Sequence, residues 1–174
     1  MSIRRLLVNF LLAILTFTVQ ISVFNRVLDF GGVTPDLMLV FVTSVAFLRG
    51  EKPGLMTGFF GGLLIDIFFG HLGFYALIYM YLGFLVGKLN EVFYSQNIAI
   101  PITIISVSDF IYNFVCYVLL LLFRKQFDIG YYMMNTIIPG VVYTALVSIF
   151  YYPVILKIHE WILEKEQRSE KKFV

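Results

Sequence analysis

The chain has 174 residues, of which 60% are hydrophobic and only 14% are charged. Soluble domains contain roughly 45 to 50% apolar and about 25% charged residues, so this composition excludes an ordinary water-soluble domain and makes lipid the solvent for most of the chain. The net charge of +2 excludes a strongly basic nucleic-acid-binding surface. One cysteine and two distant histidines provide neither a disulfide framework nor a Cys/His metal site, and we expect no cofactor.

Six apolar stretches follow one another along the chain, separated by charged and turn-forming residues. They contain no Lys or Arg, and their only acidic residues are Asp36, Asp66 and Asp109. Backbone amides in hydrocarbon need internal partners, and the stretches lack the alternation of barrel strands, so we expect helices. The predicted spans are residues 6–24, 36–48, 54–69, 73–87, 98–123 and 136–156.

The distribution of basic residues predicts the orientation in the membrane. One side of the predicted bundle collects three basic residues, which are Arg26, Arg124 and Lys125. The other collects ten, which are Arg4, Arg5, Arg49, Lys52, Lys88, Lys157, Lys165, Arg168, Lys171 and Lys172. Because basic loops stay inside, both termini are expected in the cytoplasm. We therefore predict an all-α integral membrane protein, with a six-helix transmembrane domain over residues 1–163 and a charged cytoplasmic tail over residues 164–174.

The second, third and fourth spans are short for a hydrocarbon core of about 30 Å. Either their helices run on into the connections, or the connections dip into the membrane. The connections between these spans are tight, so the three helices are predicted to be antiparallel neighbours. Asn135 and Pro139 are typical of a helix start and predict that the sixth helix begins there.

The third span carries small residues at a constant spacing of four. Such spacing is typical of membrane helices whose backbones approach closely, because lipid supplies no hydrophobic drive for their association. Packing within the bundle is the favoured interpretation, and a groove for a partner helix is the alternative. This predicted packing or partner face consists of Gly54, Gly58, Gly62, Asp66 and Gly70.

Polar residues inside the spans cannot face lipid. Asp66 is predicted to lie in the outer half of the membrane, where it would form a polar cluster with Asp36 and His71. In the fifth span, a stripe of one helix face consists of Ser106, Asp109, Asn113 and Cys116. We expect Asp36, Ser106, Asp109 and Asn113 to be buried. Hydrogen bonding between helices is the favoured role of such stripes, and a conduction path is the alternative. No nucleophile or phosphate-binding motif is present, so we expect no enzyme.

These features together resemble the MreD family of rod shape-determining membrane proteins of bacteria. The resemblance is most specific over residues 34–76 and extends weakly to Asp109, Pro153 and Lys157. It is carried by Thr34-Pro35-Asp36-Leu37, Arg49-Gly50, Gly54, Gly58-Phe59, Gly62-Leu63-Leu64-Ile65-Asp66, Leu72-Gly73 and Ala76.

The resemblance implies a non-enzymatic scaffold of the cell-elongation (rod) complex, which builds peptidoglycan and maintains cell shape. Its implied partners are an MreC-like single-span membrane protein, an MreB-like filament contacted directly or indirectly, a RodA-type glycosyltransferase and a penicillin-binding transpeptidase. It also implies a fold similar to the substrate-binding subunits of energy-coupling-factor transporters. The alternative function is therefore a vitamin-binding transporter subunit, with an outward-facing pocket near Asp36, Asp66 and His71.

Overall fold

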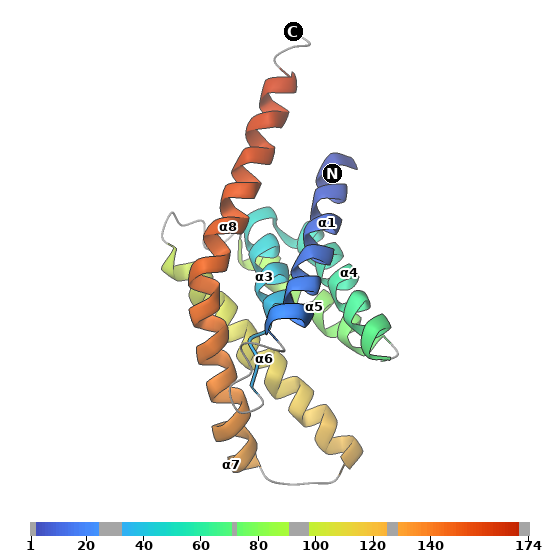
Figure 1. The fold of residues 1–174 in the computed structure, drawn as a ribbon, viewed down its shortest axis with the longest axis vertical. Coiled ribbons are helices and arrows are strands. Elements are labelled where there is room, and N and C mark those ends of the chain that lie inside the picture. The colour runs from blue at the N-terminus through green and yellow to red at the C-terminus, as the bar shows by residue number, and fades with distance from the viewer. Residues whose placement is uncertain (1–2, 25–32, 71–72, 91–97, 125–128, 171–174) are drawn as a thin grey trace.

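The computed structural model describes residues 3–24, 33–70, 73–90, 98–124 and 129–170, and this part of the chain forms six helical segments (Figure 1). Apolar runs fold this way because a helix satisfies its own backbone amides. The elements are α1 (Ile3–Val19), η1 (Gln20–Phe24), α3 (Leu37–Arg49), α4 (Glu51–Phe69), α5 (Phe74–Leu89), α6 (Ala99–Arg124), α7 (Ile129–Tyr132), η2 (Met133–Ile137) and α8 (Ile138–Glu170). The labels η1 and η2 denote single π-helical turns that continue the neighbouring α-helices.

Each predicted apolar stretch coincides with one helical segment, which confirms the all-helical fold. Three helices are long and apolar enough to cross a membrane, namely Glu51–Phe69, Ala99–Leu119 and Ile129–Lys165. The other apolar helices, Leu7–Ser22, Leu37–Arg49 and Phe74–Leu89, are shorter. The structure therefore has the helices of a membrane protein, while six crossings remain a prediction.

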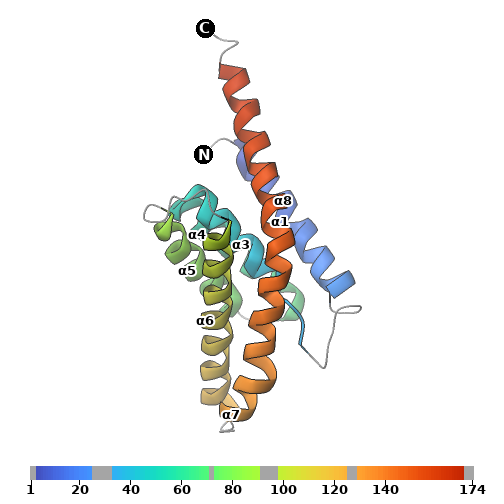
Figure 2. The same cartoon turned by 90° about the vertical axis from the view of Figure 1, so that its left-hand side faces the viewer.

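Helix α3 lies at the centre of the molecule. Every residue from position 37 to position 47 is buried, and α3 packs against α1, α4, α5, α6 and α8 (Figures 1 and 2). A helix that is apolar all round is suited to such a position. Because protein surrounds α3 on all sides, its 13 residues do not have to match the thickness of the lipid.

Helices α4 and α5 form the most extensive helix pair, and both also pack against α3. This confirms that the three short spans are neighbours. Glycines make the tight joints possible, because positive φ angles are unfavourable for residues with a Cβ. Gly50 has a φ of 87° between α3 and α4, and Gly70 and Gly73 have φ angles of 72° and 82° between α4 and α5.

The last helical segment begins earlier than expected. It starts at Ile129 and passes through η2 into α8, so Asn135 lies inside a π turn and the predicted helix start at Asn135 is wrong. Pro139 lacks the amide hydrogen that an α-helix would donate to the Asn135 carbonyl oxygen. The π turn at this place lets the helix continue despite that missing donor.

The amino end of α1 and the carboxyl end of α8 lie at the same end of the molecule (Figures 1 and 2). Helix α8 runs without a break to Glu170, past the predicted boundary between membrane domain and tail. Near this end the Lys165 ammonium lies 3.8 Å from the centre of the Trp161 ring. Such pairs are typical of a helix that leaves the membrane at its interface.

Candidate functional site

The small residues of α4 lie against the backbone of α5. A Cβ added to Gly58 would lie 2.6 Å from the Tyr79 carbonyl carbon and 3.0 Å from the Met80 Cα. A Cβ added to Gly62 would lie 2.6 Å from the Ala76 amide nitrogen. Real Cβ atoms do not come this close to backbone atoms, so only glycine permits the observed separation of the two helices.

Helix α5 contributes small residues of its own, which the sequence analysis missed. A Cβ on Gly83 would lie 2.7 Å from the Gly54 carbonyl carbon, and a Cβ on Gly87 would lie 2.6 Å from the Glu51 amide nitrogen. The spacing of four between Gly83 and Gly87 is the signal that could have identified this face. The glycines of α4 are thus covered by a helix of the same chain.

Gly70 does not belong to this contact, which corrects the five-residue face proposed from the sequence. It ends α4 in a left-handed conformation, and a Cβ added there would meet no atom within 4 Å. The spacing of four continues to Gly70 for a different physical reason, since a helix end that turns back needs a residue with positive φ.

Asp66 lies on the glycine-bearing helix and caps the next one. Its side chain is 4% exposed, and its carboxylate accepts hydrogen bonds from the Tyr75 amide at 3.1 Å and the Ala76 amide at 2.8 Å. These amides lie in the first turn of α5 and have no partner within their own helix. Asp66 and Asp36 share no hydrogen-bond partner, and the expected polar cluster remains a prediction, since His71 lies outside the described residues.

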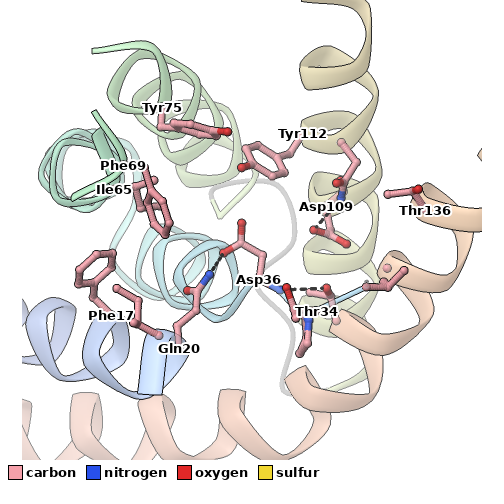
Figure 3. Close-up of a pocket in the computed structure, with 16 residues that line it drawn as sticks. Phe17, Gln20, Thr34, Asp36, Ile65, Phe69, Tyr75, Asp109, Tyr112 and Thr136 are labelled. Carbon is pink, nitrogen blue, oxygen red and sulfur yellow. Dashed lines mark hydrogen bonds between the residues drawn. The ribbon is translucent and has the colours of Figure 1, made fainter. Parts of the chain in front are cut away.

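A cavity of about 330 Å³ opens beside Asp36 at the start of α3 (Figure 3). Residues of α1, α4, α5, α6 and α8, of both π turns and of the segment 33–36 before α3 line its wall. Its polar lining consists of Gln20, Thr34, Asp36, Asp109, Asn113, Thr136 and Thr144. Its aromatic lining consists of Phe17, Phe69, Tyr75 and Tyr112. Asp66 is not among the lining residues.

Asp36 is the N-cap of α3 and is half-buried rather than fully buried, because it faces the cavity. Its carboxylate accepts hydrogen bonds from the Leu39 amide at 3.0 Å, from Gln20 Nε2 at 3.4 Å and from the Tyr79 hydroxyl. The Gln20 side-chain oxygen in turn accepts from the Met38 amide at 2.9 Å. Asp36 is therefore a well-satisfied cap that holds α1 and α5 to the start of α3.

Asp109 is the one fully buried residue of the polar stripe predicted on α6. Ser106, Asn113 and Cys116 are half-buried, so the expectation that Ser106 and Asn113 are buried is wrong. Asp109 is 1% exposed, and its Oδ1 accepts a hydrogen bond from Asn113 Nδ2 at 3.2 Å. Its Oδ2 has no hydrogen-bond partner in the described part of the chain. Ser106 donates to the Ile102 carbonyl within its own helix at 2.9 Å.

A second polar cluster, missed in the sequence, joins three helices toward the end that carries the termini. Arg49 of α3 donates from Nη1 to Asn9 Oδ1 of α1 at 2.6 Å and from Nε to His159 Nδ1 of α8 at 3.0 Å. These partners are 40 and 110 residues away in the chain, so no local spacing could predict them.

Replacing Arg49 by Gln is expected to lower the stability of the fold by about 1 to 3 kcal/mol, because hydrogen bonds from a charged group to the buried Asn9 and the half-buried His159 are lost. The exposed Lys52 is the matched control, and Lys52→Gln should change stability by less than about 0.5 kcal/mol. Thermal unfolding of both variants in the same detergent measures the difference. Equal melting temperatures would contradict a structural role of the cluster.

A groove of about 270 Å³ runs between α1 and α4 on the outside of the bundle. Its wall is mainly apolar and consists of Leu7, Phe10, Ala13, Met56, Thr57 and Phe60, together with Asn9. Asn9 is 7% exposed, and its Nδ2 has no hydrogen-bond partner among the described residues. The groove therefore combines exposed aromatic rings with one unsatisfied donor.

Comparison with known proteins identifies one family. The model of the family described as MreD, rod shape-determining protein MreD, matches residues 2–161. This range includes all six helical segments, with α8 matched up to position 161. No curated protein and no solved structure matches the chain.

Proposed function

Since this chain belongs to the MreD family of rod shape-determining membrane proteins, we propose that it is a non-enzymatic scaffold of the bacterial cell-elongation complex. The family itself implies a role in rod shape determination. The observation that carries the proposal is the extent of the match, which covers nearly the whole helical bundle and not one motif.

The proposed partners are those expected of this family. They are an MreC-like single-span protein, an MreB-like filament reached directly or through that protein, a RodA-type glycosyltransferase and a penicillin-binding transpeptidase. We place the protein in the inner membrane with both termini in the cytoplasm. The excess of basic residues on the side of the termini supports this orientation, and so does the position of both helix ends at one end of the molecule.

The groove between α1 and α4 is the proposed docking place for the single-span partner. The glycine face of α4 is not available to it, because α5 covers that face. Apolar exposure alone does not mark an interface in lipid, but a buried and unsatisfied amide inside an apolar groove does call for a partner. A transmembrane helix that carries a side-chain or backbone acceptor opposite Asn9 would satisfy Nδ2.

Photo-crosslinking in membranes tests this docking. A crosslinking amino acid replaces Phe60 in the groove or Leu77 on α5, which are 40% and 61% exposed. We expect a product with a co-expressed MreC-like protein at Phe60 and none at Leu77. A crosslink at Leu77 and none at Phe60 would contradict docking in the groove and would indicate that the partner binds beside α5. Failure of the intact protein to co-purify with any elongation-complex partner would contradict the scaffold.

The cavity favours a second candidate, a vitamin-binding subunit of a transporter. A pocket near Asp36 is present, although Asp66 does not line it. Similarity to the subunits of energy-coupling-factor transporters remains a prediction, because no solved structure matches. Purification separates the two functions: a transport subunit should retain a vitamin-sized ligand, whereas the scaffold should retain a protein partner without such a ligand.

A further inference from the structure

We propose that the cavity between Asp36 and Asp109 binds an organic cation through its ammonium group. The ammonium can belong to a free amine or to a lipid headgroup, since both present the same chemistry. This inference is independent of the scaffold function and of any partner protein. It rests on the charge balance of the cavity wall, on one unsatisfied carboxylate oxygen and on the surrounding aromatic rings.

The wall of the cavity carries acidic but no basic side chains among its described residues. Two carboxylates from different parts of the chain, Asp36 at the N-cap of α3 and Asp109 in α6, face the same space (Figure 3). A carboxylate away from water is stable only when it is hydrogen-bonded or paired with positive charge. A cation in the cavity would provide that charge for both helices at once.

The two carboxylates differ in what they still require. Asp36 already accepts hydrogen bonds from η1, α3 and α5 at both of its oxygens. Asp109 has a partner at Oδ1 only, while Oδ2 is buried and unsatisfied within the described chain. An unsatisfied carboxylate oxygen accepts a charge-assisted hydrogen bond from an N–H donor. Asp109 is therefore the residue to which the ammonium binds, and Asp36 adds longer-range attraction.

The rest of the wall suits an organic cation better than a metal ion. Aromatic side chains of Phe17, Phe69, Tyr75 and Tyr112 line the cavity, and aromatic faces attract ammonium groups. The described residues include no group of three or more His, Cys, Asp or Glu that could hold a metal ion. A volume of about 330 Å³ is also far larger than the roughly 30 Å³ that one water molecule occupies in the liquid.

Two probes test the proposal on the purified full-length chain and distinguish the sources of the ammonium. Ethanolamine is added to protein in nanodiscs of phosphatidylglycerol, and binding is measured by the rise in melting temperature. In parallel, native mass spectrometry measures retention of phosphatidylethanolamine against phosphatidylglycerol. Ethanolamine binding assigns the site to a free amine. Selective retention of phosphatidylethanolamine, with no binding of free ethanolamine, assigns the site to a lipid headgroup. Either result supports the proposal.

Matched variants locate the binding. Asp109→Asn keeps the shape of the side chain and should weaken binding at least about tenfold, which is the effect of losing one charge-assisted hydrogen bond. Ser106→Ala changes the same helix outside the cavity wall and should bind as the wild type does. The proposal is overturned if neither probe binds, or if Asp109→Asn binds as well as the wild type does.

Discussion

Replacing Gly58 by Leu is expected to separate α4 from α5 and to have the largest effect on the fold. Even a Cβ at this position would lie 2.6 Å from the Tyr79 carbonyl carbon and 3.0 Å from the Met80 Cα. Backbone atoms cannot move aside as the end of a side chain can, so the helices themselves must shift. Overpacking of a tight core costs about 1 to 3 kcal/mol, and we expect at least about 3 kcal/mol here. Unfolding in detergent with increasing dodecyl sulfate measures the loss.

Two controls on α4 distinguish close packing from a general intolerance of substitution. Phe59→Leu introduces the same residue at an exposed neighbouring position and should be almost neutral. Gly61→Ala should also be tolerated, because a Cβ there would meet side-chain atoms of Val42 and Met38 at 3.3 and 3.5 Å, and alanine favours the helix. Gly58→Ala should already be clearly destabilising. If Leu is accepted equally at positions 58 and 59, the close-packed face does not exist.

Replacing Asp66 by Leu is expected to lower the stability of the fold by roughly 2 to 6 kcal/mol, because two amides at the start of α5 lose their acceptor and each costs about 1 to 3 kcal/mol. The amides of Tyr75 and Ala76 are the groups left unsatisfied. Insertion of α4 into the membrane should improve in the same variant, by less than the about 2.5 to 3.5 kcal/mol that an aspartate costs at the centre of a membrane helix, because Asp66 lies in the last turn of α4. A strain that lacks the wild-type protein and expresses only Asp66→Leu should fail to grow as rods, because too little folded protein remains.

Asp66→Asn is the informative companion of this variant. Its side chain keeps one carbonyl oxygen, which can accept one of the two hydrogen bonds, so its stability should fall between the wild type and Asp66→Leu. Melting temperatures and the amount of folded protein in membranes give the order. A variant Asp66→Leu that inserts, melts and supports rod growth as the wild type does would contradict the capping role.

The positions of the helices follow closely from the local sequence. The apolar stretches of the sequence coincide with the six helical segments, because lipid requires each segment to satisfy its own amides. The exception is the start of the last segment, where the cap signal of Asn135 was misleading. The apolar residues before it, including Met133 and Met134, continue the helix, and a π turn accommodates Pro139.

The partners of the polar residues did not follow from the sequence. Asp66 was recognised as a residue that cannot face lipid, but its acceptor role toward α5 depends on how the end of α4 and the start of α5 lie side by side. Asp36 and Asp109 were both identified, yet their position on one cavity wall depends on the packing of α3 against α6 and α8. Gln20 and Thr144 also line that wall, and the polar spacing along their own helices could not show that they would meet there.

The sequence by itself determined that this is a helical membrane protein of the MreD family, where its helices lie, and that α4 carries a face for close approach. These properties depend on solvation and on spacing along one helix, and both are local. Only the tertiary structure decided that α5 covers that face, that Arg49 joins α1 to α8, and that Asp109 has an open oxygen in a cavity. Such contacts depend on which helices pack together. The local sequence around a residue does not indicate a partner more than a hundred positions away.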